Sequence, residues 1–158
     1  MISNDPATIS ETEKQDTTIR DLEQEITILS RLLLAARDRY QYRLERAHYS
    51  ILTLLSVRES LSVGQIASAL LLDNSTASRQ VAVMENRGLL TRTADTVDQR
   101  RSVVTMSDLG RQMHTEMREA RLAETQHIVS EWAPGELEHF ARLIRSFNQT
   151  LAVKLRNR

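Results

Sequence analysis

Two short polar stretches near the middle of the chain carry the side chains best suited to binding chemistry. The first, NSTASR at residues 74–79, holds three hydroxyls and one guanidinium. The second, DTVDQRRS at residues 95–102, places Asp98 two residues ahead of Arg100, which is followed by Arg101. Hydroxyls and guanidinium groups bond phosphates and base edges, and an arginine can fork onto guanine. The two stretches therefore indicate contact with a nucleic acid.

The remaining polar residues form no credible catalytic arrangement, and we predict that the protein is not an enzyme. There is no nucleophile motif and no phosphate-binding loop. The chain has no cysteine, which excludes disulfides, Cys–zinc sites and thiol-based redox sensing. The four histidines are scattered, and although His114 with Glu116 or Glu119 could hold a metal, solvated helix residues are the better interpretation. We therefore predict neither a metal nor a cofactor.

Helical periodicity dominates the sequence and predicts a mainly α protein with one small β-hairpin. Glycine and proline are scarce, at four and two residues, which favours helices over loops. We expect residues 1–14 to form a flexible tail, because they are polar and aperiodic. From Ile19 to Tyr40 apolar residues recur every three or four positions, which predicts one long helix. Further helices are predicted at about 49–59, 62–71, 74–87, 108–132 and from 134 onward.

Capping signals isolate the hydroxyl-rich stretch as the start of a short helix at 74–87. Ser62 and Gln65 form an S-x-x-Q capping box at the start of the helix before it, and Gly88 supplies a left-handed stop after it. At about 100° per residue, Ala77, Val81 and Met84 share one face. The opposite face carries Ser75, Ser78, Arg79 and Ala82, with Thr76 at its flank.

Two short helices joined by a tight turn are typical of a helix-turn-helix. In that interpretation the helix at 74–87 is the recognition helix, and its small side chains let it enter the major groove of DNA. The alternative is an ordinary capped and solvated first turn, which is common at helix starts.

The segment 89–106 is predicted to be a β-hairpin with DTVDQRRS at its tip. Beside a recognition helix such a hairpin is a wing, and arginine suits the negative potential of the adjacent narrow minor groove. Asp98 can hold the Arg100 guanidinium in one rotamer, so that less entropy is lost on binding. Arg101 would point away, toward a phosphate. The alternative is a solvated tip whose charges contribute little.

In the order and spacing of these features, residues 61–113 resemble the MarR (multiple antibiotic resistance regulator) family of winged helix-turn-helix transcription factors. The resemblance is carried by the D-x-S-T-x-S-R helix start, the E-N-R-G-L-L exit, the D-Q-R-R-S wing and the closing V-x-M-S-x-x-G. With the flanking helices it covers about residues 17–155. Two positions depart from the family pattern: Leu71 stands where a glycine is usual, and Ala77 is smaller than the usual branched residue.

The resemblance implies a homodimer with interlocking terminal helices that binds a pseudo-palindromic operator and often represses nearby genes. It implies that Asp98 and Arg100 are the wing pair. It also implies a set of residues facing the major groove: Ser75, Thr76, Ser78 and Arg79.

The apolar stripes at 19–40 and 137–151 independently favour a homodimer. They lie at opposite ends of the chain, and a winged helix is complete without them, so a second copy is expected to cover them. The alternative is that both helices pack within one chain. We therefore expect a flexible tail at 1–14, an N-terminal dimerisation helix at 15–46, a winged helix-turn-helix domain at 47–108 and C-terminal dimerisation helices at 109–158.

Many relatives of this type are released from DNA by small aromatic anions or drugs bound between the dimer helices and the DNA-binding lobe. Here the candidate liners of such a site are Tyr40, Tyr42, Arg46 and His48. Packing and hinge roles are the alternative for these residues. The absence of cysteine excludes the peroxide-sensing mode found in part of the family.

The formal charge is balanced, with 21 basic and 21 acidic residues, although residues 79–101 hold five arginines against three acids. This balance leaves open a second function, a winged-helix protein-interaction module without DNA binding. No apolar run approaches the roughly 18 residues of a membrane span, and the first residues do not resemble a secretory signal. A cytoplasmic protein is therefore expected.

Overall fold

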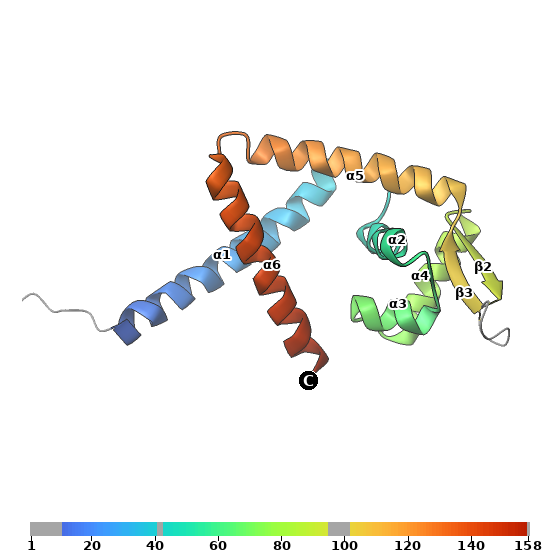
Figure 1. The fold of residues 1–158 in the computed structure, drawn as a ribbon, viewed down its shortest axis with the longest axis horizontal. Helices are drawn as coiled ribbons and strands as arrows, with labels where there is room; N and C mark the ends of the chain where they lie inside the picture. Colours follow the sequence, from blue (N-terminus) through green and yellow to red (C-terminus); the bar gives the residue numbers. More distant parts are fainter. Residues whose placement is uncertain (1–10, 41–42, 95–101, 158) are drawn as a thin grey trace, which may run out of the picture. The chain divides into compact units, whose positions relative to one another are not determined.

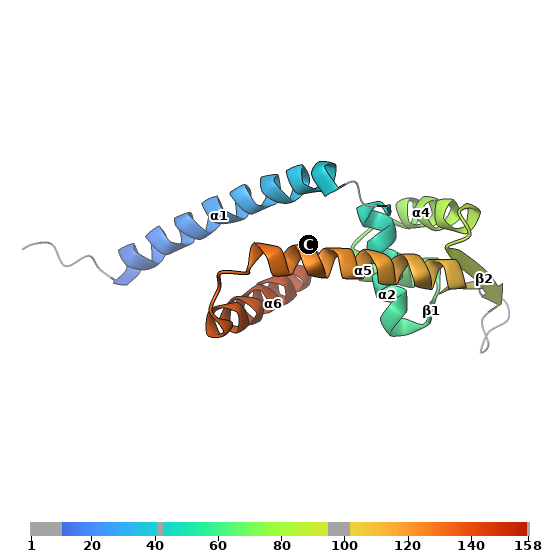
Figure 2. The same cartoon turned by 90° about the horizontal axis from the view of Figure 1, so that it is seen from above.

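The computed structural model describes residues 11–40, 43–94 and 102–157, with the backbone alone at 37–40. These parts contain six helices and three short strands, which confirms the expected mainly α fold class. The chain divides into two units, residues 1–42 and residues 43–158, and Figures 1 and 2 together label their elements.

The described part of the first unit is α1, Glu11–Tyr40. The helix includes residues 11–14, which we expected in the tail. Two acids in its first turn, Glu11 and Glu13, explain the earlier start, because negative charge is stabilising at a helix N-terminus. Leu22, Leu29 and Leu33 are exposed along this helix.

The second unit begins with α2, Arg46–Arg58, three residues earlier than expected. It continues with β1 (Ser60–Leu61), α3 (Val63–Leu70), α4 (Asn74–Asn86), β2 (Leu90–Ala94), β3 (Ser102–Met106), α5 (Asp108–Ile128) and α6 (Pro134–Arg156). Pro134 starts α6, as its fixed φ predicts, whereas α5 ends four residues before the expected Trp132.

The helix-turn-helix consists of α3, a short turn and α4. Ser62 accepts from the backbone N–H of Gln65 at 3.2 Å, and the Gln65 side chain accepts from the Ser62 N–H at 2.8 Å, which completes the predicted capping box. Leu71 ends α3 in the left-handed conformation, with φ 56° and ψ 40°. The turn thus keeps the backbone shape that a glycine adopts without cost, although a leucine supplies it.

The sheet has three antiparallel strands in the order β1-β3-β2 rather than the two strands expected. The additional strand pairs Ser60 with Thr105 and Leu61 with Val104. Two residues are too few to show the alternation of a strand, so only pairing in the folded chain defines this element. β2 and β3 pair from Leu90 and Met106 out to Ala94 and Ser102.

The core lies where α2, α3, α4 and the sheet meet, and α5 leads away from the strands past α2 (Figures 1 and 2). Its fully buried large side chains are Leu44, His48, Ile51, Leu52, Leu55, Ile66, Val81, Met84 and Val104. Not every apolar residue of α5 faces this core. Met117 is buried, whereas Leu109 and Ile128 are exposed.

Candidate nucleic-acid interface

The recognition-helix candidate α4 has two contrasting faces. Ala77, Val81 and Met84 have no exposed surface, and burying side chains such as the last two contributes roughly 1.5–3 kcal/mol each. On the other side, Ser75, Ser78 and Arg79 are exposed, and Thr76 is half-buried at the flank. The faces therefore fall as the helical spacing predicts.

Asp73 caps α4 and also binds two of the hydroxyls. One carboxylate oxygen accepts from the backbone N–H of Thr76 at 2.7 Å and from the Ser75 hydroxyl. The other accepts from the Thr76 hydroxyl at 2.7 Å. The hydroxyl hydrogen bond from Ser75, followed by those from Thr76, holds the pKa of Asp73 well below its usual range.

Because an ionised carboxylate can only accept, the hydroxyl hydrogens of Ser75 and Thr76 are directed at Asp73. The lone pairs of these two hydroxyls are then what remains for an outside partner. In this arrangement they can accept from the amino groups of adenine or cytosine, whereas phosphate oxygens have no hydrogen to offer. The sequence indicated Asp73 or Asn74 as the cap of this helix and identified the hydroxyls, but it did not predict that the hydroxyls donate to the Asp73 carboxylate.

The hairpin formed by β2 and β3 follows α4 directly in the chain. Its paired ends are Ala94 and Ser102, and the predicted wing residues Asp98, Arg100 and Arg101 lie outside the described residues. On β2, the Arg92 guanidinium donates to both carboxylate oxygens of Glu85 in α4, at 3.0 and 2.9 Å. Sequence reasoning counted Arg92 only as a basic charge, because nothing in the seven-residue separation indicates this pairing.

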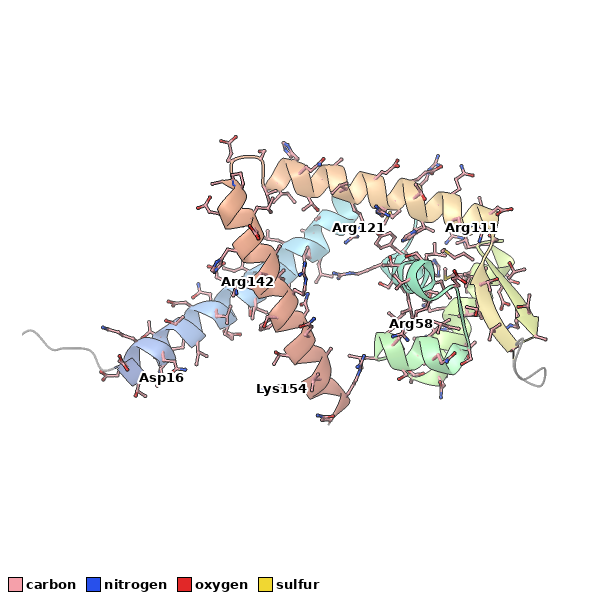
Figure 3. All side chains as sticks on the ribbon, viewed as in Figure 1. Asp16, Arg58, Arg111, Arg121, Arg142 and Lys154 are labelled. Carbon is pink, nitrogen blue, oxygen red and sulfur yellow. The ribbon has the colours of Figure 1, made fainter. Side chains whose placement is uncertain are left out.

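The other end of the hairpin is joined closely to α5. The Ser107 hydroxyl donates to the Gly88 carbonyl at 2.6 Å and accepts from the Gly110 N–H at 2.9 Å. Arg111, labelled at the sheet end of α5 in Figure 3, donates to the Met106 carbonyl at 2.7 Å. The residues of the M-S-x-x-G sequence, 106–110, therefore connect the end of the hairpin to the start of α5.

Among the ligand-binding candidates, Tyr42 and the side chain of Tyr40 lie outside the described residues. Arg46 is exposed at the start of α2. His48 is only 1% exposed, and its Nδ1 lies 3.3 Å from the guanidinium of Arg87, which follows α4. Nδ1 must accept from that cation, so Nε2 carries the ring hydrogen, which has no partner among the described residues.

The histidine considered above as a metal ligand is instead part of the α2–α5 packing. His114 stacks on Tyr49 with the ring centroids 5.4 Å apart, and its Nε2 lies 3.3 Å from the Thr53 hydroxyl. Glu116 pairs with Arg43 at 3.3 Å. No group of three potential ligands suited to a metal ion occurs in the described ranges. Within those same ranges, each helix is too short or too polar to cross a membrane.

A capped first helix, a tight turn, a second helix with an exposed polar face and a β-hairpin at its exit define a winged helix-turn-helix protein. The sequence model of the MarR family matches residues 44–102. The chain is also 32% identical over 130 residues to the uncharacterised HTH-type transcriptional regulator YxaD of Bacillus subtilis (strain 168), covering 81% of this chain and 91% of YxaD. The chain belongs to the MarR family of transcriptional regulators.

Solved structures of the same family share the fold. A MarR family protein from Bacillus stearothermophilus aligns with a TM-score of 0.75 at 21% identity, over 86% of this chain and 96% of that protein. A MarR protein from Peptoclostridium difficile aligns with a TM-score of 0.72 at 13% identity, over 99% of both chains. At such low identity these likenesses establish the architecture alone.

Proposed function

We propose that this protein is a homodimeric, sequence-specific DNA-binding repressor that a small molecule releases from its operator. The observation that carries the proposal is the exposed hydroxyl and guanidinium face of α4, opposite a fully buried face. A helix held rigidly on one side and polar on the other can enter the major groove without losing its packing.

In this proposal the α4 residues contact the major groove and the hairpin tip contacts the adjacent minor groove. Ser75 and Thr76 accept from base amino groups, while Ser78 and Arg79 bond base edges or phosphates. At the tip, Asp98 orients Arg100 in the minor groove, and Arg101 meets a phosphate. Substituting Arg100→Ala is expected to weaken operator binding by roughly 1–3 kcal/mol while leaving the oligomeric state unchanged. Fluorescence anisotropy would measure the first effect, and equal affinity of variant and parent would contradict the wing assignment.

Exposed apolar side chains on α6 support the homodimer. Phe140, Phe147 and Leu151 are all exposed on this helix, and Trp132 contacts Phe140 edge-on at 5.3 Å between centroids. A single chain with such a surface would aggregate, and a second copy offering the same face covers it symmetrically. Two recognition helices would then address half-sites about one DNA turn apart.

The effector of this proposal is a small aromatic or drug-like molecule near Tyr40, Tyr42, Arg46 and His48. His48 lies beside Arg87 at the C-terminal end of α4, so a ligand that displaced its ring would act on the recognition helix. Titrating aromatic carboxylates into the protein–operator complex would test this part, and release of DNA is the expected result.

The proposal is tested by the DNA upstream of the protein's own coding region, which we expect to contain an inverted repeat with half-sites one helical turn apart. Binding to a labelled duplex should weaken steeply as salt rises, because each phosphate contact releases counterions. A shuffled duplex of equal length is the control. Equal, weak binding to both duplexes would contradict sequence-specific recognition and favour a protein-interaction module.

A further inference from the structure

The ion pair between Arg92 and Glu85 joins the recognition helix to the wing hairpin. Two parallel hydrogen bonds, at 3.0 and 2.9 Å, connect the guanidinium to the carboxylate. A third, at 3.3 Å, runs from the same guanidinium to the Ser102 hydroxyl. One side chain on β2 therefore contacts both α4 and β3.

This contact fixes the orientation of the Arg92 guanidinium relative to the Glu85 carboxylate, which a loose surface ion pair would not do. A forked pair sets both the distance and the angle between two planar groups. Both side chains are partly covered, at 39% exposed for Arg92 and 24% for Glu85. The hydrogen bonds to the Glu85 carboxylate also raise the pKa of Arg92.

The position of the contact matters because it lies at the paired ends of the hairpin. Ser102 pairs with Ala94 at the last step of the ladder, and the seven residues of the tip span the gap between these two. Arg92 thus holds both strands close to the points where the tip departs. The direction of β2 and β3 relative to α4 then depends on this pair.

We propose that Glu85 and Arg92 are positioning residues that fix the wing hairpin relative to the recognition helix, and that Arg92 acts in this way rather than by contacting DNA. The inference rests on the proposed function, because it assigns the pair a role in binding an operator. Specific binding requires helix and wing to reach their two grooves together, so a preset angle lowers the entropy lost on binding. Non-specific binding needs only phosphates and gains little from that angle.

The direction in which one substitution changes operator affinity separates this role from simple electrostatics. Glu85→Gln removes a negative charge from α4 itself, so charge repulsion alone predicts tighter binding to any DNA. A positioning role predicts that operator affinity falls by about tenfold while affinity for a shuffled duplex is unchanged or rises. The matched control is Glu116→Gln, which removes the same charge from the Arg43–Glu116 pair and should leave operator affinity within about twofold.

The dependence of binding on salt tests Arg92 itself. Arg92→Gln should reduce operator affinity to the same degree as Glu85→Gln. Because Glu85 already neutralises Arg92, the slope of the logarithm of the binding constant against the logarithm of salt concentration should not change. A phosphate contact would instead lower that slope by about one unit and weaken both duplexes. The double variant Glu85→Gln with Arg92→Gln should be no weaker than either single variant. Additive losses would overturn the proposal.

Amide hydrogen exchange in the DNA-free protein provides a readout independent of the operator. Residues 90–94 and 102–106 should exchange several-fold faster in Glu85→Gln than in the parent, whereas Glu116→Gln should match the parent. If the parent binds no sequence specifically, the proposed function fails and exchange still tests the coupling of the hairpin. Unchanged exchange together with unchanged operator affinity in Glu85→Gln would refute the positioning role.

Discussion

At residue scale, the turn of the helix-turn-helix places Leu71 in a backbone conformation that leucine rarely adopts. A leucine in the left-handed region, at φ 56°, crowds its Cβ against the following carbonyl and costs roughly 1–2 kcal/mol. The side chain is exposed, so little packing offsets that cost. The turn between α3 and α4 is therefore kept by the two helices it joins and not by the preference of its own residue.

Two substitutions at this position separate backbone strain from the side chain. Leu71→Ala and Leu71→Gly both remove the leucine, but only glycine relieves the left-handed strain. We expect the glycine variant to be more stable than the alanine variant by about 1 kcal/mol, measured by urea unfolding. A glycine variant no more stable than the alanine variant would contradict a left-handed turn.

Between pH 7 and pH 5, His114 is a residue through which pH should affect stability. Burial, and secondarily the charge of Arg118, lowers its pKa in the folded chain. The unfolded chain, with a histidine pKa of about 6.5, then binds a proton at a pH where the folded chain does not. The free energy of unfolding should consequently fall as the pH drops below about 6.5.

Urea unfolding of the parent and of His114→Gln between pH 7 and pH 5 would check this expectation. The loss of stability on acidification should be smaller in the variant, because the titrating group is gone. Identical losses in both proteins would assign the pH dependence to other groups.

At the scale of elements, the start of α5 is fixed against the exit from α4. A Cβ built on Gly110 would lie 2.1 Å from the carbonyl oxygen of Leu89, which is a backbone atom and cannot rotate away. Ser107 bridges the same place through the Gly88 carbonyl. Close approach of two backbones, and not a turn, therefore explains this glycine of the V-x-M-S-x-x-G pattern.

Gly110→Ala is expected to destabilise the protein by about 1–3 kcal/mol, since the helix must move away from Leu89 to admit a methyl group. Thermal unfolding followed by circular dichroism would measure the effect. Gly135→Ala is the matched control, because a Cβ there meets nothing within 4 Å. Equal melting temperatures for Gly110→Ala and the parent would show that α5 is not held this close to Leu89.

At the scale of the whole molecule, the folding of one chain does not depend on burying the apolar surface of α6. The structure describes all of α6, and every residue of this helix is at least partly exposed. Phe147 is 38% exposed. A charge on this helix therefore disturbs little inside one chain. The same charge would be buried in the dimer proposed above, at a high cost.

Phe147→Asp should consequently yield a folded monomer that has lost most of its operator affinity, because a monomer reaches only one half-site. Analytical ultracentrifugation would give the mass, and circular dichroism would confirm the helices. Asn148→Asp adds the same charge at the neighbouring polar position and should remain dimeric. A dimeric Phe147→Asp protein would place the interface elsewhere.

The amino-acid sequence by itself determined the features that depend on near neighbours. The capping box at Ser62 and the two faces of α4 follow from residues three or four positions apart. The glycine stop at Gly88 and the proline start of α6 follow from the φ angles that single residues allow. Local periodicity and caps act within one or two helical turns, and this is why the fold class was predictable.

Only the tertiary structure decided which distant groups meet. Ser60 and Leu61 form the strand β1 because they pair with β3. The Arg92–Glu85 contact forms because the hairpin packs back onto α4. The same is true of the left-handed Leu71, whose own preference is overruled by the packing of α3 on α4. Such contacts depend on burial and geometry across the whole unit. They leave no pattern in the local spacing of residues, so the sequence alone does not predict them.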